Sequence, residues 1–310
     1  MKFRWIALLV LAGVAASGAA GAAWVISAPR PAFHAKDEAA LASGDAGRGK
    51  AVFDAGACAS CHASPGQPNR LVLGGGMALA SPFGTFYPPN ISQDRADGIG
   101  SWRAIDIANA VMSGVSPKGN HYYPALPYVN YAKMRREDMA DLIAYLRTLP
   151  AIPGGTPAHD LPAPFKIRRA IGFWKALYFE QETMRPDPAH DAAWNRGRYL
   201  VDALSHCGEC HSAHNVLDAV KEKARYAGGI DQSGVGFVPN ITPAGIGHWS
   251  LQEIVASLTT GDTPEGRKLA GSMADMVLNT AALPEPDRAA MAAYLKSLPP
   301  RRSPEAVKTR

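Results

Sequence analysis

The feature that most constrains this chain is a five-residue motif that occurs twice and uses all of its cysteines. Both Cys58-Ala-Ser-Cys61-His62 and Cys207-Gly-Glu-Cys210-His211 read C-x-x-C-H. This motif attaches c-type haem, because two thiols at this spacing form thioether bonds with the two vinyl groups of one porphyrin. The histidine that follows binds the iron as its proximal ligand. The sequence therefore predicts two covalently bound haem c groups, held by Cys58, Cys61, Cys207 and Cys210, with His62 and His211 as iron ligands.

Other uses of paired cysteines fit this pattern less well. Two disulfides are compatible with an exported chain, but a disulfide does not require a histidine after each pair. A zinc site places its two pairs roughly 15–20 residues apart, whereas Cys207 lies 146 positions beyond Cys61. A thioredoxin-like redox site needs one motif within a βαβ unit.

Sequence blocks around the two motifs recur in the same order, about 149 residues apart. Tyr145-Leu146-Arg147-Thr148-Leu149-Pro150 returns as Tyr294-Leu295-Lys296-Ser297-Leu298-Pro299. Pro89-Asn90-Ile91 matches Pro239-Asn240-Ile241, and Gly98-Ile99-Gly100 matches Gly245-Ile246-Gly247. These blocks predict two copies of one domain, at 40–150 and 193–300, with a connector at 151–192 that packs on both.

Helical signals agree between the two copies. A helix is expected before each motif (45–56 and 194–204) and at the end of each copy (136–149 and 286–298). Apolar residues at i, i+3, i+4 and i+7 predict a further helix after Ser101, its expected N-cap, and another from Leu251. Segments 74–90 and 228–240 lack periodicity and are expected to be loops around the haem. The predicted fold is all-α, with two tandem cytochrome c domains. The connector is expected to contain a helix at 165–179, and the polar tail at 301–310 is expected to be disordered.

An uncharged apolar run of 23 residues, from Trp5 to Ser27, follows Lys2 and Arg4. Its length suits one membrane span, and the positive charges before it place the N-terminus inside the cell. The alternative is a cleaved signal peptide, with small residues at 16–23 as the cleavage region. We favour an anchor at 1–31, because Trp24, Val25 and Ile26 extend the run past those small residues. In either case the haem domains are exported. The net charge of +5 is modest and spread along the chain, so it gives no indication of nucleic-acid binding.

Each iron needs a second axial ligand, and methionine is the common choice. The candidates after the first motif are Met77, Met112, Met134, Met139 and His121; those after the second are Met273, Met276 and Met291. Three of these methionines lie on predicted amphipathic helices and are expected in the core: Met112, Met139 and Met291. We favour Met134 for the first haem and Met273 for the second, with Met276 as the alternative.

Four repeated residues have two open interpretations each. Trp102 and Trp249 either pack in the core or donate the indole N–H to a haem propionate. Asn90 and Asn240 either donate toward the haem edge or only fix a turn. Three further histidines are expected on the surface or near propionates: His206, His214 and His248.

The blocks around the motifs resemble a known family, the membrane-anchored cytochrome c subunits of bacterial periplasmic dehydrogenases. The second-domain resemblance is carried by Trp194-Asn195-Arg196-Gly197-Arg198-Tyr199-Leu200 and by the motif that follows. The first-domain resemblance is carried by Pro82-Phe83-Gly84-Thr85 and Tyr123-Pro124-Ala125-Leu126-Pro127-Tyr128. Relatives with an apolar residue at the position of Leu126 carry methionine at the position of Met134. The resemblance therefore implies Met134 as a ligand. Gly271-Ser272-Met273-Ala274-Asp275 resembles the block that supplies the second ligand.

The resemblance implies an electron relay in the bacterial inner membrane, with its haem domains in the periplasm. Electrons would come from a dehydrogenase subunit that oxidises alcohol, gluconate, aldehyde or a similar substrate. They would leave to quinone, a soluble cytochrome or a terminal oxidase. The chain itself is then not an enzyme. The alternatives are a dihaem peroxidase, which needs one iron open to peroxide, and a stand-alone carrier. The alcohol and gluconate enzymes often use a three-haem subunit, whereas this chain has two motifs.

Overall fold

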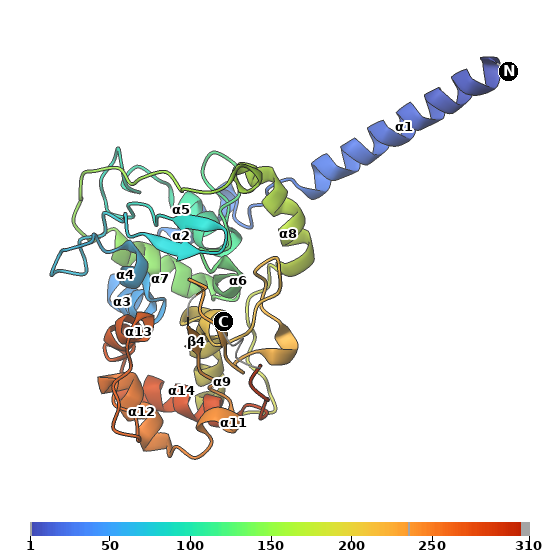
Figure 1. The fold of residues 1–310 in the computed structure, drawn as a ribbon. Coiled ribbons are helices and arrows are strands. Elements are labelled where there is room, and N and C mark those ends of the chain that lie inside the picture. Colours follow the sequence, from blue (N-terminus) through green and yellow to red (C-terminus); the bar gives the residue numbers. More distant parts are fainter. Residues whose placement is uncertain (1, 235, 305–310) are drawn as a thin grey trace.

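The structure, a computed structural model, describes residues 2–234 and 236–304, and these are mostly helical (Figure 1). The first half contains α1 (Lys2–Ile26), α2 (Glu38–Leu41), α3 (Ala46–Ala55), α4 (Cys58–His62), β1 (Leu79–Ser81), β2 (Gly84–Phe86), α5 (Ala104–Ser113), α6 (Tyr128–Tyr131) and α7 (Arg136–Leu146). The helix α8 (Ile171–Tyr178) lies in the connector. The second half contains α9 (Ala192–Tyr199), α10 (Cys207–Cys210), β3 (Gly229–Ile230), β4 (Phe237–Val238), α11 (Pro243–Ile246), α12 (Leu251–Thr260), α13 (Ser272–Thr280) and α14 (Glu285–Ser297).

In each domain the first long helix crosses the last at very close range. A Cβ atom on Gly49 of α3 would overlap the backbone of Asp141 on α7, and one on Gly197 of α9 would overlap the backbone of Ala290 on α14. Only glycine lets two helix backbones approach this closely. An ion pair from the preceding arginine reinforces each crossing: Arg48 Nε to Asp141 Oδ2 at 2.7 Å, and Arg196 Nη2 to Asp287 Oδ2 at 2.6 Å.

Several expected element boundaries need correction. Helix α5 begins at Ala104, and its N-terminal cap is Arg103 rather than Ser101. The Asp106 carboxylate accepts a hydrogen bond from the Arg103 backbone N–H at 3.1 Å, while Ser101 Oγ donates to the Arg95 carbonyl. The expected helix at 165–179 is two 3₁₀ turns, Ala163–Lys166 and Arg168–Ala170, followed by α8. Prolines at 162 and 164 remove helix-forming N–H groups at its start.

The expected loops at 74–90 and 228–240 each contain a small antiparallel hairpin. Leu79 pairs with Phe86, and Gly229 pairs with Val238. These strands are two or three residues long, too short for a period-2 pattern in the sequence. The first hairpin also holds the connector, because Thr85 bridges to Asp160. The hairpins do not change the fold class, which is helical as predicted.

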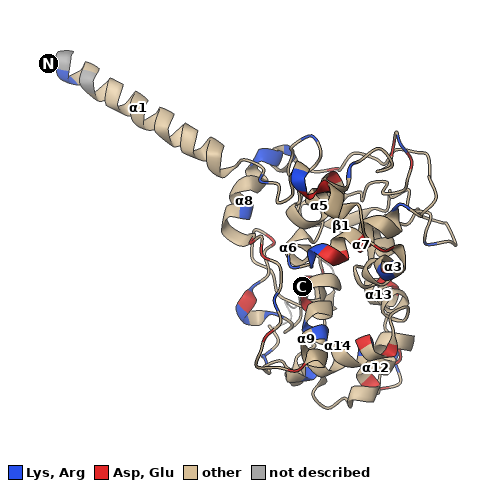
Figure 2. Ribbon diagram, turned by 180° about the vertical axis from the view of Figure 1, so that it is seen from behind, with Lys and Arg blue, Asp and Glu red and all other residues tan. Residues whose placement is uncertain are grey.

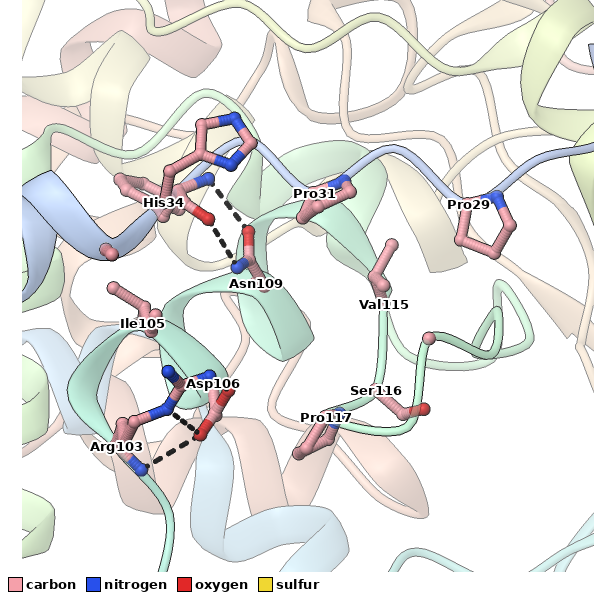
Figure 3. Close-up of a pocket in the computed structure, with 13 residues that line it drawn as sticks. Pro29, Pro31, His34, Arg103, Ile105, Asp106, Asn109, Val115, Ser116 and Pro117 are labelled. Carbon is pink, nitrogen blue, oxygen red and sulfur yellow. Dashed lines mark hydrogen bonds and ion pairs between the residues drawn. The ribbon is translucent and has the colours of Figure 1, made fainter. Parts of the chain in front are cut away.

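Helix α1 projects away from the rest of the molecule (Figure 1). Residues Arg4–Ile26 are long and apolar enough to span a membrane, by length and composition. The chain that follows α1 lies across α5, where the Asn109 side chain hydrogen-bonds both the N–H and the C=O of Phe33 at 2.9 Å (Figure 3). A shallow cavity of about 430 Å³ lies beside this segment and is lined mainly by Pro29, Pro31 and the start of α5.

The connector contacts both domains, and part of the tail is ordered. Trp174 Nε1 donates to the Leu217 carbonyl at 2.7 Å, and Lys175 Nζ donates to the Gly114 carbonyl at 2.9 Å. The Asn240 side chain binds the Arg301 carbonyl at 2.7 Å, so the prediction of disorder is wrong for 301–304. Residues 305–310 lie outside the described residues.

Candidate functional site

Both C-x-x-C-H motifs form a short helix that begins after a residue with left-handed backbone geometry. Ala57 precedes α4 with φ 52°, and His206 precedes α10 with φ 40°. A non-glycine residue in this region costs on the order of 1–3 kcal/mol and persists only where its surroundings fix it. The same costly turn before both motifs therefore marks two equivalent sites.

The two motif histidines are held in the form that binds iron. The Nδ1 atom of His62 lies 2.8 Å from the Pro89 carbonyl oxygen, and the Nδ1 atom of His211 lies 2.8 Å from that of Pro239. A carbonyl only accepts, so the proton is on Nδ1 and the lone pair is on Nε2. Burial also lowers the pKa of both imidazoles, which favours the neutral ligand form. These residues fit a haem iron at each site.

The structural role of Pro89 and Pro239 was missed from the sequence. The Pro-Asn-Ile block was recognised as a repeat, but nothing in it identified the proline carbonyl as the partner of the histidine. The signal was available in its position, because the block recurs 27–28 residues after each motif histidine. A proline has no N–H, so its carbonyl is the one backbone hydrogen-bonding group it offers.

The other interpretations of the cysteines have no support in the described residues. All four cysteines are described, and none forms a disulfide. Within 2–234 and 236–304, no group of three or more His, Cys, Asp or Glu is placed to hold a metal ion. The structure therefore has two separate C-x-x-C-H sites, and in each the proximal histidine is hydrogen-bonded to a proline carbonyl. The chain carries two haem c groups.

The methionines fall into different environments. Met134 is 1% exposed and lies in the turn directly before α7, where its N–H bonds to the Tyr131 carbonyl. Met273 is in the first turn of α13, half-buried against the hydrophobic core, and Met276 is half-buried one turn later. Met77 is half-buried in the loop after the first motif. The three methionines expected in the core are fully buried on helices: Met112, Met139 and Met291.

The candidate ligand His121 has another role. This side chain is buried, and its Nε2 lies 2.9 Å from the Ser27 carbonyl at the end of α1. The atom that would face an iron therefore binds the backbone that follows the apolar helix.

The repeated asparagines each fix a turn. Asn90 Oδ1 accepts from the Ser92 N–H at 2.9 Å, and its Nδ2 donates to the Ile152 carbonyl at 2.7 Å. Asn240 repeats this arrangement with Thr242 and Arg301. Each asparagine thus ties the proline that holds the proximal histidine to the chain that follows the last helix.

The two repeated tryptophans differ. Trp102 packs against the core. Trp249 Nε1 donates to Glu265 Oε1 at 2.9 Å, so in this structure the indole has a protein carboxylate as its partner. Hydrogen bonds from His248 and Trp249 lower the pKa of Glu265 to about 2, so this carboxylate is charged at neutral pH.

The two haem-attachment segments meet at the interface between the domains. Ser60, inside the first motif, accepts a hydrogen bond from Asn279 of α13 at 2.7 Å. Tyr131 of α6 donates to the carbonyl of Gly56, just before the first motif, at 2.6 Å. The same Tyr131 ring packs edge-on against His206, just before the second motif, with centroids 5.6 Å apart.

His206 therefore lies at the domain interface, where it is half-buried rather than on the open surface; a place near a haem propionate stays a prediction. Burial lowers its pKa to about 4, so the imidazole is neutral at physiological pH.

Replacing Tyr131 with phenylalanine should lower the free energy of unfolding by about 1–2 kcal/mol, because the buried Gly56 carbonyl would lose its donor. Thermal unfolding of the haem-loaded protein would measure this. Tyr178→Phe is the control, because Tyr178 is exposed and its loss should change the unfolding temperature little. Equal unfolding temperatures for Tyr131→Phe and wild type would show that this hydrogen bond does not contribute to the stability of the protein.

Comparisons with known proteins agree with two haem sites. Residues 46–150 match the cytochrome c family. The chain is 44% identical over 297 residues to a dihaem c-type cytochrome of Cereibacter sphaeroides, covering 93% of this chain and 96% of that protein. It is 40% identical to the fructose dehydrogenase cytochrome subunit of Gluconobacter japonicus, covering 81% and 52%. It is 33% identical to the gluconate 2-dehydrogenase cytochrome c subunit of Pantoea cypripedii, covering 81% and 59%. The chain thus spans somewhat more than half the length of these two dehydrogenase subunits.

Proposed function

Because the chain belongs to the dihaem c-type cytochromes related to the cytochrome c subunits of bacterial membrane dehydrogenases, we propose that it is a membrane-tethered electron relay. It takes electrons from a dehydrogenase subunit in the periplasm and passes them toward the respiratory chain. The haem irons supply the one-electron redox chemistry, while the protein sets their ligands, burial and docking surfaces. Substrate oxidation belongs to the partner.

The observation that carries this proposal is the meeting of the two attachment segments at one interface. Electron transfer requires that redox groups lie close together. Here Ser60 of the first motif binds the second domain, and His206 beside the second motif packs on Tyr131 of the first. A chain that only carried two independent haems would have no need to join the domains through these segments.

The axial ligands proposed opposite His62 and His211 are Met134 and Met273, with Met276 as the alternative for the second haem. Met134 is fully buried in a turn, where a thioether is shielded from water. Methionine ligation raises the reduction potential of a haem relative to a second histidine. With methionine on both irons neither has an open position, which favours a relay over a dihaem peroxidase.

Helix α1 is proposed to be an uncleaved anchor in the inner membrane. The 23 residues Arg4–Ile26 correspond to about 35 Å of helix, enough to cross a hydrocarbon core of about 30 Å. Lys2 and Arg4 at its start support an orientation with the N-terminus in the cytoplasm and the haem domains in the periplasm.

The donor class follows from the relatives, which are cytochrome subunits of fructose, gluconate and quinone-dependent alcohol dehydrogenases. A nicotinate dehydrogenase subunit is also similar, at 38% identity over 81% of this chain. The proposed donor is therefore a periplasmic dehydrogenase, and the proposed acceptor is quinone, a soluble cytochrome or a terminal oxidase.

Purification of the detergent-solubilised native protein, followed by mass spectrometry of its companions, tests the relay. A flavin, molybdenum or quinoprotein dehydrogenase should copurify, and its substrate should reduce both haems in the complex. Copurification of no dehydrogenase would favour a stand-alone membrane carrier. A high-spin ferric component that responds to peroxide would instead favour a peroxidase.

A further inference from the structure

Helix α8 exposes apolar residues where a surface helix of a soluble protein would bury them. A surface helix normally buries its apolar stripe and exposes its polar one. In α8 the buried positions are Gly172 and Lys175, whereas Phe173 and Leu177 are 43% and 69% exposed. Ala176 and Ala170, the last residue of the 3₁₀ turn before α8, are also exposed. Spacings of three and four residues place positions 170, 173, 176 and 177 on one side of the helix. We call Ala170, Phe173, Ala176 and Leu177 the α8 apolar face.

The lysine on the buried side is fully engaged, which fixes this orientation. Lys175 Nζ donates to the carbonyls of Ser113 and Gly114 and lies 4.4 Å from the centroid of the Tyr128 ring. Rotating α8 to bury Phe173 and Leu177 would break these hydrogen bonds. The exposed apolar face is therefore built into the packing on the first domain.

Helix α8 is joined to the end of α1. A side chain on Gly172 would overlap the backbone of Ser27, so the two segments touch without a gap. Arg169, in the 3₁₀ turn before α8, donates to the Trp24 carbonyl at 2.6 Å and to Ser27 Oγ at 2.9 Å. Its guanidinium lies 4.0 Å from the Trp24 ring centroid. The α8 apolar face therefore lies where α1 leaves the membrane proposed above, next to its C-terminal end (Figure 1).

The surroundings of α8 combine apolar and basic groups. Phe165 and Ile167 precede it and are exposed, as are Val216 and Leu217 beside Trp174. Lys166, Arg168 and Arg169 lie among them in the two 3₁₀ turns before α8, and Figure 2 shows Lys and Arg colouring on the ribbon beside α8. An exposed apolar stripe flanked by cations is the composition of a segment that lies in a membrane interface.

We propose that the α8 apolar face, with its neighbours Phe165, Ile167 and Leu217, rests in the outer leaflet of the membrane that α1 crosses. The apolar side chains enter the boundary between headgroups and acyl chains, and the basic side chains contact anionic phospholipid headgroups. Because α8 contacts both domains, this second attachment fixes the orientation of both haems relative to the membrane. The inference rests on the membrane tether of the proposed function.

The test uses full-length, haem-loaded protein in nanodiscs that contain phosphatidylglycerol. All four native cysteines lie in the haem motifs and are consumed by thioethers, so one introduced cysteine is the reactive thiol. The variants are Leu177→Cys on the α8 apolar face, Leu251→Cys at the start of α12, and Leu11→Cys within α1. Reaction with a polyethylene glycol maleimide, followed on a gel, reports access from water.

Leu177→Cys should react on the order of tenfold or more slowly than Leu251→Cys, and Leu11→Cys should be protected. Exposure alone predicts the reverse, because Leu177 is 69% exposed and Leu251 is 44% exposed. Fast reaction at position 177 with protection at position 11 overturns the inference and leaves the anchor intact. Fast reaction at position 11 shows that α1 is not embedded in the membrane, and then both the proposed anchor and the inference about α8 fail. Protection at position 177 that appears only after a dehydrogenase is added also overturns the inference, because the face would then belong to a protein partner.

Discussion

Replacement of Met134 with alanine is expected to convert one haem from a six-coordinate low-spin to a high-spin or solvent-ligated state. Its reduction potential should fall on the order of 100 mV, a fraction of the roughly 0.8 V over which axial ligands set haem potentials. Optical spectra and a potentiometric titration would measure both changes, and the second haem should keep its own potential. The expectation rests on the proposed ligation of the first haem iron by Met134, which is 1% exposed and lies in the turn before α7, outside a helix.

Met139→Leu is the matched control, because Met139 is equally buried but lies within α7. Leucine nearly conserves its volume, so the spectra should not change. If Met134→Ala kept the wild-type spectrum, the proposed ligand would be wrong and Met77 would be the next methionine to replace.

For the second haem, Met273→Ala and Met276→Ala separate the two candidates. Both side chains are half-buried on α13, and they lie three residues apart on one face of the helix. Only the variant that removes the ligand should lose the low-spin spectrum of that haem. A spectral change with Met276→Ala alone would assign Met276, one helical turn after Met273, as the ligand of the second haem.

The sequence predicts the haem chemistry better than the packing around it. The attachment cysteines and proximal histidines follow from covalent chemistry that permits one spacing, so they are readable without a fold. The repeat also gives the helices that flank each motif. The role of the Pro89 carbonyl could not be read from residue type, because a backbone acceptor leaves no signature there; only the recurring position of the Pro-Asn-Ile block pointed to it.

Tertiary contacts explain the remaining differences. Ser101 is a good N-cap by type, but Arg103 and Asp106 cap α5 together, and the hydroxyl of Ser101 binds Arg95 instead. His206 was expected on the surface or near a propionate. Its contact with Tyr131 depends on how the two domains dock, which no local pattern encodes. The orientation of α8 could not be read from the sequence either: the connector was expected to pack on both domains, but no pattern indicated that Lys175 is buried and Leu177 exposed.

Gly49→Ala should destabilise the first domain by about 3 kcal/mol or more. The new Cβ would overlap the Asp141 backbone on α7, and helix backbones cannot separate without weakening the core and the Arg48–Asp141 ion pair. Circular dichroism and calorimetry of the haem-loaded protein would show a lower unfolding temperature for this domain. Gly47→Ala is the control on the same helix, since Gly47 is exposed and alanine favours a helix by about 1 kcal/mol over glycine.

Gly197→Ala extends the prediction to the second domain, where the Cβ would overlap the Ala290 backbone. If the repeat reflects one packing solution, this variant should lower the unfolding temperature of the second domain and leave α3 and α7 packed as in the wild type. If the Gly49→Ala variant and the Gly197→Ala variant each unfolded at the wild-type temperature, the close helix crossing would be contradicted in both domains. Each variant could instead change only the optical spectrum of the haem in its own domain. Because α3 and α9 precede the haem motifs, that result would show that each crossing positions the helix that leads into its motif.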